Sequence, residues 1–258
     1  MFAWFRRRRR ARVRAAPFPS VWLEVLEKHV PYYESLSLDD RAELRGHIQV
    51  FLAEKPFEGC GGLEINDDIR VTVAAHACLL LLHRETEYYP ELSSILVYPH
   101  AYVAKKTRTE GGVVIEEEQA RLGESWTRGV VVLAWDDVLR SAHDVRDGHN
   151  VVFHEFAHQL DQEDGEADGA PQLPRFSMYG TWARVFTDDY ERLMQADERG
   201  KKTVIDSYGA VSPAEFFAVV TETFFEKPIQ LRTKHPELYQ QLESYYRQDP
   251  AAARERKR

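Results

Sequence analysis

Residues 153–158 carry the side chains in this sequence that are best suited to metal chemistry. The run reads Phe-His-Glu-Phe-Ala-His, so His154 and His158 stand four positions apart with Glu155 between them. On a helix, residues i and i+4 lie one above the other on one face. Two imidazoles placed in this way can bind one Zn²⁺, and the Glu can activate a water molecule on it. If the run forms an accessible helix, it predicts a metal-dependent hydrolase.

The same four-residue pattern also arises by chance in ordinary helices. Here its neighbours are mostly apolar, which predicts a buried helix, and buried histidines need polar partners, of which a metal ion is one. Asp147 and Gly148 form a turn signal and Asn150 is a good N-cap, so we expect the helix to span about 151–162. The alternative is that both histidines are core residues of a helix without a metal.

A catalytic zinc usually has three protein ligands and one water, so a third ligand must come from elsewhere in the chain. The extended motif of the metzincins is absent, and Asp164 stands where its third His would be, which makes Asp164 one candidate. The stronger candidate is Glu215, which is followed by a long apolar run. Ser212 and Glu215, with Pro213 between them, also match a helix capping box, in which Glu215 would bind the backbone of Ser212 instead.

Two further acids lie at helical spacing from these candidates. Asp161 follows His158 by three positions and could orient a ligand imidazole, although it could equally be an ordinary acid on a helix face. Glu222 lies two turns after Glu215 on the same face. It could orient a ligand in the same way, or replace Glu215 as the third ligand.

Together these segments resemble the Mlc titration factor A family of zinc peptidases. The resemblance covers roughly residues 20–245 and rests on His-Glu-Phe-Ala-His-Gln-Leu-Asp at 154–161, on Tyr208 with 214–219, and on flanking segments at 77–82, 123–126, 131–135 and 224–226. It implies a gluzincin-type site, related to the catalytic domain of anthrax lethal factor. In that site one Zn²⁺ is bound by His154, His158 and Glu215. Glu155 is then the base, and Tyr208 assists by donating to the oxyanion.

The elements that must position these residues follow from the spacing of apolar and β-branched residues. We expect helices at 20–30, 39–53, 67–83, 136–142, 182–194, 213–226 and 236–247, and strands at 95–103, 113–115 and 129–135. A strand just ahead of the His-Glu helix could hold a peptide backbone by strand addition. With the resemblance, this predicts an α+β fold: a zincin-like metallopeptidase domain, mainly helical, with a small mixed β-sheet next to the His-Glu-x-x-His helix.

The composition predicts a soluble globular protein, since 43% of the 258 residues are hydrophobic and 29% are charged. We expect a basic disordered arm over 1–19, a single domain over 20–248 and a basic disordered tail over 249–258. The first 14 residues contain seven Arg and no acid, whereas the whole chain has a net charge of −8. Such an acidic body with a short basic arm is not typical of direct nucleic-acid binding. Contact of the arm with an anionic membrane or with RNA is the alternative to a solvated tail.

Cysteine content and apolar runs bear on location. Two cysteines, Cys60 and Cys78, are too few for a disulfide scaffold, which favours a reducing compartment. The chain shows neither the apolar core of a secretory signal nor the ~18 consecutive apolar residues of a membrane span. We therefore expect a cytoplasmic protein.

The leading functional hypothesis is a zinc peptidase with aminopeptidase-like action on short peptides, which the family resemblance implies. The resemblance also implies that the protein binds and sequesters the glucose repressor Mlc and thereby regulates sugar phosphotransferase genes. The alternative hypothesis is a non-catalytic regulatory binding protein whose zinc site is structural or vestigial.

Overall fold

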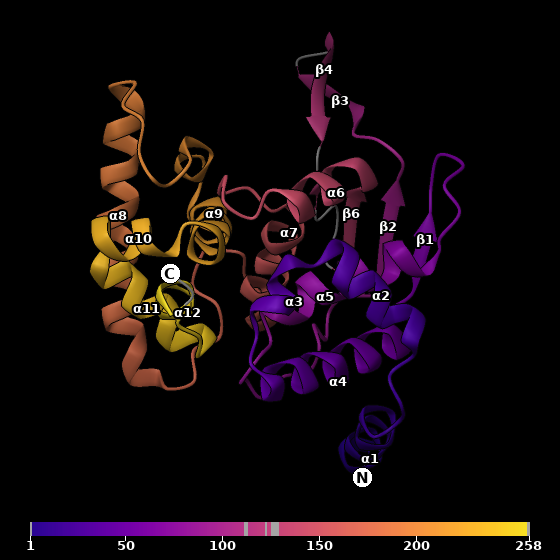
Figure 1. The fold of residues 1–258 in the computed structure, drawn as a ribbon. Helices are drawn as coiled ribbons and strands as arrows, with labels where there is room; N and C mark the ends of the chain where they lie inside the picture. Colours follow the sequence, from indigo (N-terminus) through magenta and orange to yellow (C-terminus); the bar gives the residue numbers. More distant parts are fainter. Residues whose placement is uncertain (1, 111–112, 122, 125–128, 257–258) are drawn as a thin grey trace.

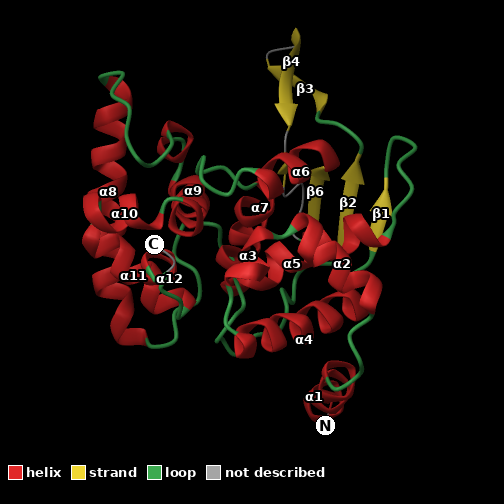
Figure 2. Cartoon of the chain, viewed as in Figure 1, coloured by secondary structure: helices red, strands yellow, loops and turns green. Residues whose placement is uncertain are grey.

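The computed structural model describes residues 2–110, 113–121, 123–124 and 129–256. Its α-helices are α1 (Phe2–Arg14), α2 (Ser20–His29), α3 (Pro31–Ser35), α4 (Leu38–Glu54), α5 (Asp67–Leu79), α6 (Trp135–His143), α7 (Val151–Asp161), α8 (Tyr179–Glu198), α9 (Pro213–Glu226), α10 (Pro228–Lys234), α11 (Pro236–Tyr246) and α12 (Pro250–Glu255). Its strands are β1 (Phe57–Gly59), β2 (Ser94–Tyr98), β3 (Tyr102–Glu110), β4 (Val113–Arg121), β5 (Gly123–Glu124) and β6 (Val130–Ala134). The predicted α+β class with mainly helical content is confirmed (Figure 2).

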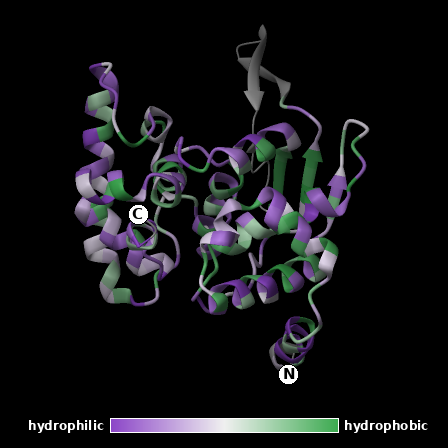
Figure 3. Ribbon diagram, in the orientation of Figure 1, coloured by the Kyte–Doolittle hydropathy of each residue, from purple (hydrophilic) through white to green (hydrophobic). Residues whose placement is uncertain are grey.

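One small mixed sheet stands beside the helices, with the strand order β1-β2-β6-β5. The strands β1, β2 and β6 are parallel, and β5 pairs antiparallel with β6. The two central strands, β2 and β6, are largely hydrophobic, as the green ribbons in Figure 3 show. This matches the rule that parallel strands covered on their faces read as continuous apolar runs. The helix α7, which carries the His-Glu motif, contacts β6 and β5, so the sheet lies where we expected it.

Helix α7 is also enclosed by other helices. It contacts α5, α6 and α9, and α5 is covered in turn by α2 and α4 (Figure 1). Phe153 and Phe156 of α7 are fully buried, and their rings meet Phe225 of α9 and Tyr89 at centroid distances of 5.0 and 4.8 Å. Aromatic pairs at such distances add stability beyond their buried area. This packing fixes the rotation of α7 and therefore the direction in which its histidines point.

Local capping determines where the two site helices begin. The side chain of Asn150 accepts a hydrogen bond from Phe153 N at 3.0 Å, as expected for the N-cap of α7. The side chain of Ser212 accepts one from Glu215 N at 3.2 Å, with Pro213 at the first helical position of α9. Both helices therefore start at the residues that the sequence indicated.

The strands differ in part from the prediction. The segment expected as one strand over 95–103 is divided, because β2 ends at Tyr98 and β3 begins at Tyr102. Pro99 stands between them, and proline has no N–H to donate to a sheet ladder. The strand predicted at 113–115 extends to Arg121 as β4, which pairs with β3 in a separate two-stranded sheet. Residues 125 and 126, which contribute to the family resemblance, lie outside the described residues.

The two ends of the chain differ from the disordered arms that we expected. Residues 2–14 form α1, which is tied to the body because Arg10 forms ion pairs with Glu54 and Glu87 at 2.8 and 2.7 Å. Residues 250–255 form α12, with Asp249 as a side-chain N-cap. In both cases an ion pair or a helix cap stabilises a helix, and such a contact cannot be recognised from a run of basic residues alone. The single domain over 20–248 stays a prediction.

Among the described residues, no helix has both the length and the apolar character that crossing a membrane requires.

Candidate metal centre

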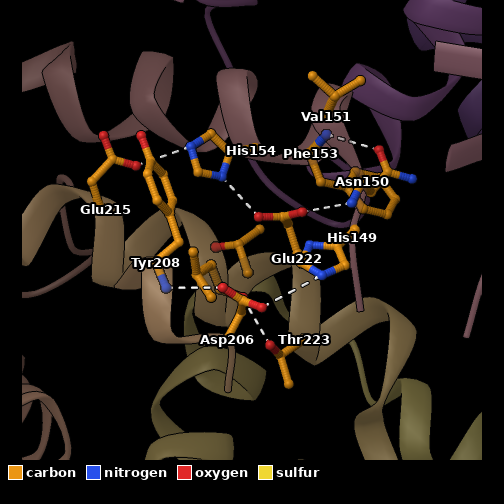
Figure 4. A network of polar contacts seen from close by, with 12 residues as sticks. His149, Asn150, Val151, Phe153, His154, Asp206, Tyr208, Glu215, Glu222 and Thr223 are labelled. Carbon is orange, nitrogen blue, oxygen red and sulfur yellow. Dashed lines mark hydrogen bonds and ion pairs between the residues drawn. The ribbon is translucent and has the colours of Figure 1, made fainter. Parts of the chain in front are cut away.

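Two neighbouring helices bring the proposed ligands together. His154 and His158 belong to α7, and Glu215 belongs to the first turn of α9. Figure 4 shows His154 and Glu215 facing each other. His154 Nε2 lies 3.0 Å from Glu215 Oε2 and 3.3 Å from His158 Nε2. The third pair, His158 Nε2 and Glu215 Oε2, is 3.4 Å apart. Only half of the predicted capping box is therefore used, since the carboxylate of Glu215 faces the histidines while its backbone N–H binds Ser212.

The three atoms fit a single zinc ion. Nitrogen and oxygen ligands bound tetrahedrally at about 2.1 Å stand about 3.4 Å from one another, close to the separations of 3.0, 3.3 and 3.4 Å found here. Glu215 Oε2 is buried and has no hydrogen-bond partner of regular geometry among the described residues. Two imidazole nitrogens and a carboxylate oxygen that face one another in a partly buried place need a cation between them.

The electrostatics also favour positive charge at this point. Burial alone would lower the pKa of His154, but its close contacts with the carboxylates of Glu215 and Glu222 raise that pKa well above the usual value. Burial alone would raise the pKa of Glu215, but the two imidazoles lower it to about 2. The cluster is therefore built to hold a proton or a metal ion rather than to remain neutral.

Glu222, one of the two acids expected near the ligands, contacts His154 from the side away from the cluster. Glu222 Oε1 lies 2.7 Å from His154 Nδ1, and Glu222 Oε2 accepts a hydrogen bond from Asn150 N at 2.5 Å (Figure 4). With Nδ1 donating to this carboxylate, Nε2 of the neutral ring keeps its lone pair for the cluster. A carboxylate in this position both orients a ligating imidazole and raises its basicity.

Substitution of Glu222 should therefore weaken metal binding without removing a ligand. We expect Glu222→Ala to lower zinc affinity by about 10–100-fold, the usual effect of losing the partner of a ligating His. Competition with a chromogenic zinc chelator measures this change, and Glu191→Ala on the exposed face of α8 is a matched control. Zinc affinity unchanged in Glu222→Ala would show that the hydrogen bond does not tune the site.

Glu226 supports the loop before α7, a role that was not predicted from the sequence. It lies one turn after Glu222, is fully buried, and accepts hydrogen bonds from Gly148 N, Asn150 Nδ2 and Tyr32 Oη at 3.0, 3.3 and 3.1 Å. Together, Glu222 and Glu226 hold the loop that leads into α7. The available signal was the spacing of two acids on one face of a very apolar helix.

Glu226 should make stability depend on pH. Burial, followed by hydrogen bonding to Asp147, raises the pKa of Glu226 to about 9. As pH rises from about 4 to 9, the unfolded chain releases this proton and the folded chain keeps it, so the free energy of unfolding falls, by at most about 1.4 kcal/mol per pH unit. We expect Glu226→Gln to reduce this dependence, which urea unfolding at about pH 5, 7 and 9 measures. Equal slopes in the variant and the parent chain would contradict the assignment.

Glu155 lies beside the cluster and has a free oxygen. Its side chain is buried, and Glu155 Oε2 has no hydrogen-bond partner among the described residues. Burial raises the pKa of Glu155, while the positive charge on His154 and His158 acts against that rise. A carboxylate with a raised pKa and an unused oxygen is suited to accept a proton and pass it on.

Tyr208 lies on the exposed side of the cluster. It belongs to the short 3-10 helix η3 (Ser207–Ala210), and its ring centroid is 5.9 Å from that of His154 (Figure 4). Asp206 caps η3 by accepting a hydrogen bond from Tyr208 N at 2.8 Å, and it also lies 3.5 Å from His149 Nε2. Burial raises the pKa of Tyr208, as do the nearby carboxylates. Its phenol therefore stays protonated and can donate a hydrogen bond.

Comparison with known proteins agrees with this geometry. The family model described as glucose-regulated metallo-peptidase M90 matches residues 3–247. The chain belongs to this metallopeptidase family. An uncharacterized protein of Synechocystis sp. is 45% identical to it over 236 residues, which cover 91% of this chain and 86% of that protein. Proteins named Mlc titration factor A from Klebsiella pneumoniae and Salmonella agona are 31% and 30% identical, over 87% and 86% of this chain and 85% and 84% of theirs.

Two acids near the His-Glu motif of this M90-family chain lie outside the cluster. The carboxylate of Asp161 accepts a hydrogen bond from Gly169 N at 2.9 Å, where it holds the loop after α7. Burial raises the pKa of Asp161 to about 7. Asp164, the rival third ligand, is exposed and accepts a hydrogen bond from Glu166 N at 3.3 Å. Neither belongs to the group of ligand atoms that includes both histidines.

A second group with ligand-type atoms, Asp40, Glu43 and His83, is explained without a metal. His83 Nε2 lies 3.3 Å from Asp40 and its Nδ1 lies 3.2 Å from Glu43, so each ring nitrogen already faces its own carboxylate. The three residues therefore pair with one another, and we place no metal ion there.

Proposed function

We propose that this chain is a zinc-dependent peptidase with a zincin-like fold and aminopeptidase-like action on short peptides. The observation that carries the proposal is the convergence of His154 Nε2, His158 Nε2 and Glu215 Oε2 at separations of 3.0–3.4 Å. Membership of a metallopeptidase family supports it. The proposed cofactor is one Zn²⁺ per chain, held by these three residues.

When bound, the zinc ion would polarise the scissile carbonyl and lower the pKa of a water molecule. Glu155 would take a proton from the attacking water with its unpartnered oxygen and later deliver it to the leaving amine. Glu222 would keep His154 in the tautomer that leaves Nε2 available, through the contact of 2.7 Å at Nδ1. Tyr208 would donate a hydrogen bond from its phenol to the oxyanion of the tetrahedral intermediate.

The sheet next to α7 supports the choice of an extended peptide as substrate. Among the described strands, β5 is the outer one on the side of β6, and it contacts α7. An outer strand offers unpaired backbone groups, to which a peptide can add as a further strand. We propose that the substrate backbone lies along β5, beside the motif helix.

The proposed role of Tyr208 predicts a defect in catalysis rather than in binding. Tyr208→Phe removes the donor but keeps the ring, and we expect kcat to fall about 10²–10³-fold, as when an oxyanion donor is lost. Zinc content should stay unchanged, because the phenol is not a proposed ligand. Steady-state kinetics with zinc analysis measures both. Parent-like kcat in Tyr208→Phe would exclude this role.

A peptide-library digest tests the proposed activity and its specificity. The purified chain is incubated with free and N-acetylated short peptides, with and without a chelator, and products are identified by mass spectrometry. We expect stepwise loss of N-terminal residues from free peptides only, abolished by chelation and restored by zinc. Cleavage of acetylated peptides at internal bonds would replace the aminopeptidase assignment with an endopeptidase. Absence of cleavage from every zinc-loaded sample would contradict the peptidase proposal.

A second proposed function is binding of the transcriptional repressor Mlc, with the cytoplasm as the proposed location. It is supported by the name of the relatives at 30–31% identity, Mlc titration factor A. Calorimetric titration of the purified repressor into the parent chain and into Glu155→Gln separates this role from catalysis. Equal affinity for both would make binding independent of hydrolysis, and lack of binding to the parent chain would remove this second function.

A further inference from the structure

The helix α1 has one face docked on the protein and one face left free. Its docked face meets α4, where Arg10 is nearly fully buried and binds Glu54 Oε1 and Oε2 at 2.9 and 2.8 Å. The guanidinium of Arg10 also lies 4.7 Å above the ring of Tyr88. One turn later, Arg14 Nη2 contacts the ring of His47 at 3.3 Å. These contacts order α1 and determine which of its residues face outward.

The free face combines aromatic and basic side chains. Trp4 and Phe5 are 54% and 58% exposed, and their rings pack edge to face at a centroid distance of 5.0 Å. Arg8, one turn after Trp4, stacks over its ring at 4.6 Å. Arg7 and Arg12 are exposed and form no ion pair with any residue that the structure describes. A pair of large aromatic rings left in water beside unpaired arginines indicates a surface with a partner.

The charge of α1 is opposite to that of the chain as a whole. The first 14 residues contain seven Arg and no acid, whereas the net charge of the chain is −8. In Figure 1, α1 lies at one extremity of the molecule, beyond α4. Helices α4 and α5 stand between α1 and α7, because contacts run from α1 to α4, from α4 to α5 and from α5 to α7. A partner bound to the free face of α1 would therefore not cover the candidate metal centre.

We propose that the free face of α1 docks on an anionic membrane surface, with Trp4 and Phe5 inserted at the level of the lipid headgroups. Amphipathic helices bind in the plane of the interface through apolar burial together with attraction of Lys and Arg to anionic lipids. Tryptophan and phenylalanine next to arginines are typical of that depth, and each basic residue near such a surface adds to binding. In α1, neighbouring residues of one helix supply both the apolar side chains and the positive charge.

Nucleic acid fits this surface less well. Binding to a phosphate backbone needs basic groups along a tract, whereas the acidic remainder of this chain would repel a polymer that extends beyond α1. A membrane needs only the short patch that α1 offers. Both rings of the aromatic pair are more than half exposed, so they can enter an interface.

Vesicle co-sedimentation of the full chain tests the proposal. We expect binding to vesicles that contain phosphatidylglycerol, no binding to pure phosphatidylcholine, loss of binding at high salt, and no competition by free inorganic phosphate. The charge variant Arg7→Gln/Arg8→Gln/Arg12→Gln should lower the partition coefficient by at least about tenfold. Trp4→Ser/Phe5→Ser should lower it as well, while peptidase activity and the melting temperature stay at the parent values.

A matched control removes the same charge elsewhere. Arg199→Gln/Lys201→Gln/Lys202→Gln neutralises three exposed basic residues after α8 and should bind vesicles like the parent chain. Equal losses in the two triple variants would show a general charge effect and overturn the proposal. Equal binding to both lipid compositions would also overturn the proposal. The same holds if the chain binds single-stranded RNA tightly and does not bind vesicles.

Discussion

Glu155→Gln is expected to abolish peptide hydrolysis and to leave zinc binding intact. The amide has the size of the carboxylate but cannot accept the proton of the attacking water. A positioned general base contributes about 10²–10⁴-fold to a rate, so kcat should fall by at least that factor. Glu155 is not a proposed ligand, and its carboxyl group is buried next to the cluster rather than in it.

The measurement pairs kinetics with metal analysis on the same preparation. Zinc content is determined after dialysis, and hydrolysis is followed with the best peptide from the library digest. Glu166→Gln, an exposed acid beyond the motif helix, is the matched control and should behave like the parent chain. Hydrolysis by Glu155→Gln within a few-fold of the parent rate would remove Glu155 as the base.

Glu215→Gln should have the largest effect on metal binding. The carboxylate is the only charged member of the three ligands when the imidazoles are neutral, and its oxygen lies 3.0 and 3.4 Å from their Nε2 atoms. The substitution keeps the backbone N–H that binds Ser212, so the start of α9 is preserved. We expect zinc affinity to fall by more than the about 10–100-fold expected for Glu222→Ala, because a ligand is lost rather than its support.

A parallel variant decides between Glu215 and Asp164 as the third ligand. Asp164→Asn should leave zinc affinity unchanged, since its carboxylate caps a turn at the surface. Chelator competition gives both affinities under one set of conditions. If Asp164→Asn loses zinc and Glu215→Gln retains it, the ligand assignment is wrong and the motif helix must bind metal in another arrangement.

The site helices could be predicted from the sequence because their signals are local. Asn150 and Ser212 cap the helices by contacts within three residues, and the spacing of His154 and His158 depends only on helical geometry. The sequence alone left Glu215 with two roles. Its N–H donates to the capping side chain of Ser212, while its carboxylate faces the histidines instead of returning to the Ser212 backbone; this distinction requires the packing of α9 on α7.

The elements that were missed depend on contacts distant in sequence. Glu226 supports the loop before α7 across 76 residues, through Asn150, and the spacing of two acids on one apolar helix does not reveal that distant partner. The basic segment that forms α1 was expected to be a disordered arm, and Arg10 ties it to the body by binding Glu54, 44 residues away. Arrangements of this kind follow from tertiary packing, which sequence periodicity does not contain.

Anomalous X-ray scattering at the zinc absorption edge, from crystals of the zinc-loaded chain, shows directly whether His154, His158 and Glu215 bind zinc. We expect one strong peak per chain, bonded at about 2.0–2.2 Å to His154 Nε2, His158 Nε2 and Glu215 Oε2. A peak at Asp40, Glu43 and His83 instead, or no peak between α7 and α9 in crystals shown to contain zinc, would contradict it.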